Sequence, residues 1–219
     1  MTEWSRNLPL SNRARRDESG VTGNWSQPVA TVLVALADII AADPARLDGP
    51  TLRDGVTLER ALQELTTRMR WSRWQRILAR VGAIDAPDEA VLALDREALL
   101  SSLRIDAADR AAGRRGSSLR DLREASVLLL DVAEAQRLTV AVAADTTGAV
   151  ALDLALRVPL PRRSVVQART LRAIDGDWQV GSGPVLPSTA AAIVLFLAER
   201  GGLPQELEEP DDEDPTLEP

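Results

Sequence analysis

The sequence predicts an α+β protein in which an N-terminal four-helix bundle is followed by a small α+β domain. Between residues 26 and 137, apolar residues recur at the three- and four-residue spacing of amphipathic helices. After Leu138 this period gives way to short apolar or alternating runs, separated by turn sequences, which are typical of strands. The 219 residues are enough for two units of ordinary domain size.

Four helices are expected in the first part, because four amphipathic stretches are joined by short connections. Ser26 is expected to cap the first helix, with Pro28 in its first turn, and Ser117 or Ser118 to cap the fourth. The expected ranges are 26–43, 57–81, 87–112 and 117–137.

Two hairpins and a helix are expected in the second part. The first hairpin pairs residues 138–144 with 149–158 around the turn sequence at 145–148. The second pairs 171–174 with 178–180 around Asp175-Gly176, with Trp178 in the core. A final helix, capped by Ser188, runs to about Arg200. The predicted organisation is a mobile arm at 1–24, the bundle at 25–137, the α+β domain at 138–203 and a disordered acidic tail at 204–219.

The composition excludes several kinds of chemistry. The chain has no Cys and no His, so it lacks both the thiolate and imidazole ligands of zinc sites and the base of a Ser-His or Cys-His pair. All 26 basic residues are Arg, which excludes a Schiff base on Lys. The formal net charge is −7. The eight acidic residues between 205 and 219 carry more negative charge than the net charge of the whole chain.

The N-terminus and the apolar runs indicate a cytoplasmic protein without a membrane partner. The first 24 residues carry Arg but no apolar core, unlike a signal peptide. No uninterrupted apolar run reaches the roughly 20 residues of a membrane span.

Three stretches resemble the mycothiol-dependent maleylpyruvate isomerase family, an actinobacterial family with a DinB-like four-helix bundle and a small C-terminal domain. The stretches are Leu47–Thr51 with Gly55–Leu65, Leu122–Asp131, and Thr170–Pro184 with the apolar helix that follows it. Together they relate residues from about 26 to 203 to the full length of the family.

The resemblance implies a divalent metal, usually zinc, that is held by His, Glu and His and activates the thiol of mycothiol. In this sequence the two His positions fall on Glu64 and Leu128, and the Glu position falls on Glu124. Only Glu124 matches the expected ligand. Glu64 and Glu124 could still hold a hard cation such as Mg²⁺ if Asp131 completed the set, because hard cations prefer oxygen ligands.

The leading interpretation is therefore a pseudoenzyme with a degenerate metal site and no cofactor. It binds a small molecule or a protein partner in a cleft that includes Arg68, Trp71 and Leu128. The alternative is a mycothiol-dependent isomerase or transferase with a divalent metal on Glu64, Glu124 and Asp131. A third hypothesis is an interaction protein that works through its N-terminal arm and acidic tail.

Simpler interpretations exist for the charged residues. Glu64 and Arg68, like Arg120 and Glu124, have the four-residue spacing of a helix ion pair. Arg residues interleave with Trp71 and Trp74 between residues 68 and 80, a pattern that could bind nucleic acid. The strongly acidic tail repels phosphate, so we expect no nucleic-acid partner; the same Arg patch can instead pair with the tail.

Overall fold

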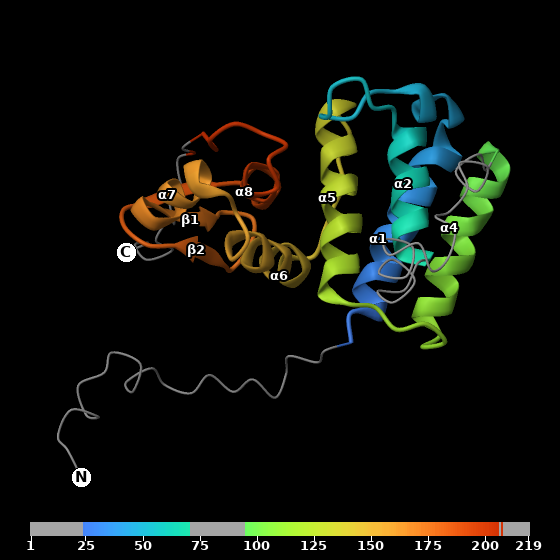
Figure 1. Ribbon diagram of the computed structural model, residues 1–219, viewed down its shortest axis with the longest axis horizontal. Coiled ribbons are helices and arrows are strands. Elements are labelled where there is room, and N and C mark those ends of the chain that lie inside the picture. Colours follow the sequence, from blue (N-terminus) through green and yellow to red (C-terminus); the bar gives the residue numbers. More distant parts are fainter. Residues whose placement is uncertain (1–23, 71–94, 206, 208–219) are drawn as a thin grey trace, which may run out of the picture.

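The computed structural model describes residues 24–70, 95–205 and 207. Within these residues the chain forms seven α-helices, one short 3₁₀ helix and one three-stranded sheet, in agreement with the α+β class (Figure 1). No described helix is both long enough and apolar enough to cross a bilayer. Four predicted segments lie outside the described residues. They are the arm, the end of the second helix with Trp71 and Trp74, the start of the third helix, and most of the acidic tail.

Four helices lie side by side in the first part of the chain (Figure 1). They are α1 (Ser26–Ala42), α2 (Leu58–Arg70), α4 (Arg96–Ala111) and α5 (Leu119–Ala135), and the 3₁₀ helix η3 (Pro44–Asp48) follows α1. Helices α1 and α2 each contact both α4 and α5, so the four surround one apolar core. Fully buried leucines from all four fill it, among them Leu33, Leu62, Leu103 and Leu129.

Side-chain caps explain where two of these helices begin. Ser118 caps α5 as expected, and it forms a reciprocal capping box with Asp121. Asp95 caps α4 by accepting a hydrogen bond from the Ala98 N–H at 2.7 Å. Ser26 is not the cap of α1, which corrects the prediction. Its N–H donates to the Asn24 side chain and its hydroxyl donates to the Arg115 carbonyl, because the chain arrives there beside the α4–α5 loop.

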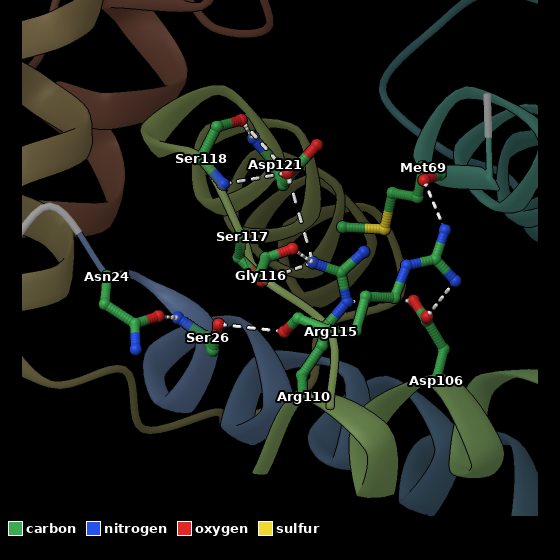
Figure 2. A network of polar contacts seen from close by, with 10 residues as sticks. All are labelled: Asn24, Ser26, Met69, Asp106, Arg110, Arg115, Gly116, Ser117, Ser118 and Asp121. Carbon is green, nitrogen blue, oxygen red and sulfur yellow. Dashed lines mark hydrogen bonds and ion pairs between the residues drawn. The ribbon is translucent and has the colours of Figure 1, made fainter. Parts of the chain in front are cut away.

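A polar network joins the ends of the four helices beside that loop (Figure 2). The Arg110 side chain is 1% exposed and donates to Asp106 at 3.0 Å and to the Ser117 hydroxyl. Arg115 donates to Asp106 at 2.7 Å and to the Met69 carbonyl, near the end of α2, at 2.8 Å. Asp121 lies 3.9 Å from Arg110. Two guanidiniums thus meet two carboxylates, and the charges of the network balance.

The first predicted hairpin is wrong, because its second half and its turn form a helix, α6 (Ala144–Ala155). Val150 and Ala151 of α6 are buried, whereas Leu152 and Leu156 are 60% and 73% exposed. Leucines are exposed here while Thr147 and Asp153 are buried, so the sequence shows no clean separation of a polar and an apolar face. Gly148 lies in α6 opposite the Trp178 ring, where a Cβ would come within 3.1 Å of it.

The second predicted hairpin is present. Strand β1 (Thr170–Ala173) pairs antiparallel with β2 (Gln179–Gly181) across the Asp175-Gly176 turn. The prediction missed two elements, α7 (Leu160–Ala168) and β3 (Val185–Ser188), and β3 pairs parallel with β1 on the opposite edge from β2.

Two details of the C-terminal part differ from prediction. The last helix, α8 (Ala190–Leu197), is capped by Thr189, because Ser188 ends strand β3. Trp178 is half-buried and packs on α6, where its indole N–H donates to the Thr147 hydroxyl at 3.0 Å. The prediction places Trp178 in the core against the last helix, whereas its indole packs on α6.

Candidate functional site

A pocket of about 240 Å³ lies where the two parts of the chain meet. Helix α2 contributes one wall and α5 contributes another, while α6 and the residues after α8 complete it. Helix α5 is the element that connects the parts, because it contacts α1 and α2 as well as α6 and α8. The apolar lining includes Leu65, Val127, Leu128 and Leu154.

Five of the six residues proposed from sequence line this one pocket. They are Glu64, Arg68, Glu124, Leu128 and Asp131. Glu64 and Arg68 are one turn apart on α2, and the other three share a face of α5. Trp71, the sixth, lies outside the described residues.

Glu64 is shared by three arginines. Both terminal nitrogens of Arg53 lie 3.0 Å from its Oε2 atom, Arg60 lies 3.4 Å from Oε1, and Arg68 lies 3.8 Å from Oε2. The predicted Glu64–Arg68 ion pair is therefore present, but it is the longest of the three. One carboxylate faces three guanidiniums, which leaves an excess of positive charge at this wall.

Asp131 holds a second arginine at the pocket. Its side chain is 3% exposed and lies 3.3 Å from Arg200 Nε, and it also accepts the Leu52 N–H at 2.6 Å. Burial raises the pKa of Asp131, although the Leu52 N–H and the charges of Arg200 and Arg53 oppose the shift. Burial also disfavours the charged form of Arg200 and so lowers its pKa.

The pKa of Arg200 depends on other charged residues of the pocket. Asp131 raises the pKa of Arg200, whereas the charges of Arg53 and Arg68 lower it. The charges of Arg53 and Arg68 therefore repel the charge of Arg200.

The remaining charged residues of the pocket belong to α5. Arg123 donates to Asp153 of α6 at 2.6 Å, and Asp153 also accepts from Arg157 at 3.0 Å. Glu124 accepts from Arg120 at 2.7 Å, as the four-residue spacing predicts. The Arg123–Asp153 pair ties α5 to α6, and the Arg120–Glu124 pair engages Glu124 within α5.

The carboxylates of the pocket do not fit a metal site. Each is paired with arginine, and within residues 24–70, 95–205 and 207 no group of three or more acidic, His or Cys side chains is placed to share a cation. Leu128, where the resemblance places a His, has no donor atom. Among the described residues, Glu64, Glu124 and Asp131 are therefore not grouped as the ligands of one cation, which is the arrangement that the alternative hard-cation interpretation needs.

Three arginines of the pocket were not found from sequence. Arg53 lies in the loop before α2, Arg123 on α5, and Arg200 beyond α8. No local signal separates them from the other basic residues, since all 26 are Arg. Their convergence depends on contacts between segments up to about 150 residues apart, which a local pattern does not contain.

Comparisons with known proteins give one distant similarity. No protein-family model matches the chain, and no curated protein matches it. The fold is similar to a structure described as "Crystal structure of the mycothiol-dependent maleylpyruvate isomerase", with 14% sequence identity and a TM-score of 0.45 over 84% of this chain and 94% of that one. At this distance the similarity assigns neither site residues nor an activity to this chain.

Proposed function

We propose that this chain binds a small anionic molecule in the pocket between α2, α5 and the residues after α8, without metal-dependent thiol chemistry. The observation that carries the proposal is the convergence of Arg53, Arg68 and Arg200 on one pocket in which Glu64 and Asp131 are their nearest carboxylates. An unbalanced cluster of guanidiniums in a concave site attracts anions, and each guanidinium can donate two parallel hydrogen bonds to an oxyanion.

Arg68 is the donor most available to a ligand. Its side chain is 51% exposed and its ion pair with Glu64 is the longest of the three at 3.8 Å. Arg53 is more strongly engaged, because it donates twice to the same Glu64 oxygen. An anion that enters the pocket can therefore take donors from Arg68 without separating the shorter Arg53–Glu64 pair.

The size and lining of the pocket favour a small ligand over a protein partner. Pockets for drug-sized molecules usually have about 300 to 1,000 Å³, and this one has about 240 Å³. Leu65, Val127, Leu128 and Leu154 offer an apolar surface for a short organic body. In this proposal Leu128 forms part of the wall of the binding site. The four helices of the first part then form a bundle of the DinB-like type.

We favour binding over the alternative of an isomerase or transferase, because each carboxylate of the pocket is paired with arginine. We therefore place the carboxylates in another role. Glu64 and Asp131 orient the arginines and reduce their mutual repulsion, so that the pocket is ready to accept one more negative charge.

Thermal unfolding in the presence of acetate, pyruvate, oxalate, sulfate or phosphate tests the proposal, with sodium chloride at equal ionic strength as the reference. A ligand that binds only the native state at a hundred times its dissociation constant stabilises it by about 2.7 kcal/mol. We expect at least one of these anions to raise the melting temperature, and calorimetry to give one site per chain. The proposal fails if none acts beyond chloride, or if Arg68→Gln and Arg200→Gln respond as the wild type does.

A further inference from the structure

Arg200 reaches the pocket from a turn whose geometry is unusual. The turn ends α8 with two hydrogen bonds, from the Arg200 N–H to the Leu195 carbonyl at 2.8 Å and from the Glu199 N–H to the Phe196 carbonyl at 3.1 Å. This pattern is the Schellman motif, which requires a left-handed residue after the helix. Glu199 takes that conformation, with φ of +61°.

A left-handed glutamate makes the turn unfavourable by itself. The left-handed region is disfavoured for residues with a Cβ, and glycine is the usual choice at this position. The turn that carries Arg200 therefore needs support from elsewhere in the fold. Asp131 pairs with the Arg200 guanidinium, which leaves the backbone of the turn to be held by other residues.

Arg162 of α7 supplies contacts to that backbone. Its guanidinium donates to the Phe196 carbonyl and, at 3.0 Å, to the Gly201 carbonyl. The same group lies over the Phe196 ring, 5.0 Å from the ring centre. The two carbonyls lie on either side of Arg200 in sequence, so one side chain clamps the turn from both ends.

We propose that Arg162 is a positioning residue for the anion pocket: by clamping the turn after α8 it holds the Arg200 guanidinium against Asp131 and at the pocket. This inference rests on the proposed function. Arg162 does not line the pocket itself, and its effect on a ligand passes through Arg200. Arginine suits the role because its Nη1 donates to both carbonyls while the planar group lies over an aromatic ring, whereas the compact ammonium of lysine does not stack in this way.

The test compares Arg162→Met with Arg163→Met. Arg163 is the next residue on α7, and its exposed side chain has no hydrogen-bond or ion-pair partner among the described residues, so the control removes the same charge from the same helix. The first readout is the dissociation constant for whichever of oxalate, pyruvate, acetate, sulfate and phosphate binds the wild type most tightly. We expect Arg162→Met to weaken binding about tenfold, the scale of one lost charged hydrogen bond, and Arg163→Met to leave it unchanged.

A double-mutant cycle separates positioning from general destabilisation. In an Arg200→Gln background, Arg162→Met should have no further effect on binding, because the residue through which it acts is absent. Equal losses in both backgrounds would overturn the inference. If Arg162→Met does not fold, Arg162→Lys decides, and it should weaken binding only when Arg200 is present.

A readout without ligand separates this inference from the proposed function. The Arg200 Nε–H signal in a ¹H–¹⁵N spectrum is assigned by its disappearance in Arg200→Gln. It should move toward the position of exposed arginines in Arg162→Met and stay in place in Arg163→Met. If no anion binds the wild type but this signal moves, the proposed function fails while the clamp stands. If the signal does not move, the clamp is wrong.

Discussion

The polar network beside the α4–α5 loop and the pocket between α2 and α5 both consist of arginines and carboxylates. They differ in the balance of charges and in exposure to solvent. In the network, Arg110 and Arg115 meet Asp106 and Asp121, and the Arg110 side chain is 1% exposed (Figure 2). In the pocket, Glu64 is shared by three arginines, and Arg68 is 51% exposed.

The comparison separates a structural role from a binding role. A buried guanidinium with balanced charges holds helices together, and its burial keeps it away from a ligand. An exposed guanidinium in a cluster with too few carboxylates contributes little to folding but keeps donors for an anion. The ratio of charges and the access of solvent, rather than the presence of arginine, distinguish the two regions.

The largest effect is expected from Arg110→Ala. Removing one partner of a buried ion pair leaves Asp106 partly uncompensated and typically lowers the free energy of unfolding by about 3 to 5 kcal/mol. Urea unfolding measures this effect. Arg114→Ala is the control, because the Arg114 side chain is 64% exposed and its loss should change stability by less than about 0.5 kcal/mol. A similar change in the free energy of unfolding for both variants would show that the network does not stabilise the fold.

Arg68→Gln should impair anion binding and leave the stability of the fold unchanged, in contrast to Arg110→Ala. Loss of a hydrogen bond to a charged group costs about 1.5 to 3 kcal/mol of binding free energy, or roughly ten- to more than a hundredfold in affinity. Because Arg68 is half-exposed, the melting temperature without ligand should stay close to that of the wild type. Calorimetry and thermal unfolding of the same samples check both parts. A large loss of stability would place Arg68 with the structural arginines.

Glu199→Gly should stabilise the native state by about 1 kcal/mol, the scale of the left-handed penalty that glycine avoids. Arg137→Gly is the matched control. Arg137 has φ of +54° at the end of α5, where the Leu138 N–H bonds to the Ala133 carbonyl at 2.7 Å in the same motif. Equal gains in thermal unfolding would show that both penalties are intrinsic to the backbone. A gain at Arg137 alone would show that contacts of the Glu199 side chain offset the penalty beside the pocket.

The smallest effect concerns the pH dependence of Asp131. Its folded-state pKa is raised above the unfolded value, so between about pH 4 and the folded-state pKa the native state binds more protons than the unfolded state. Stability from this group therefore falls as pH rises through that window. Asp131→Asn lacks the titration, so the stability of the variant relative to wild type should improve from pH 3.5 to pH 7 in urea unfolding. A relative decline would mean that the ion pair with Arg200 outweighs burial.

The sequence determined those features that depend on residues close together in the chain. The capping box at Ser118, the hairpin turn at Asp175-Gly176 and the ion pairs Glu64–Arg68 and Arg120–Glu124 all follow from spacings of a few residues. Local spacing also placed Glu124, Leu128 and Asp131 on one face of α5.

Tertiary structure decided the features that depend on distant neighbours. The stretch that forms α6 exposes Leu152 and buries Asp153, so its period did not separate helix from strand. Arg53 and Arg200 reach the pocket through a loop and a turn, and neither position is set by a periodic pattern. Glu64 pairs with Arg60 and Arg68 of its own helix, which four-residue spacing allows, but its shortest ion pair is with Arg53 of the preceding loop. The charge of a site is the sum of groups that meet only in the folded chain.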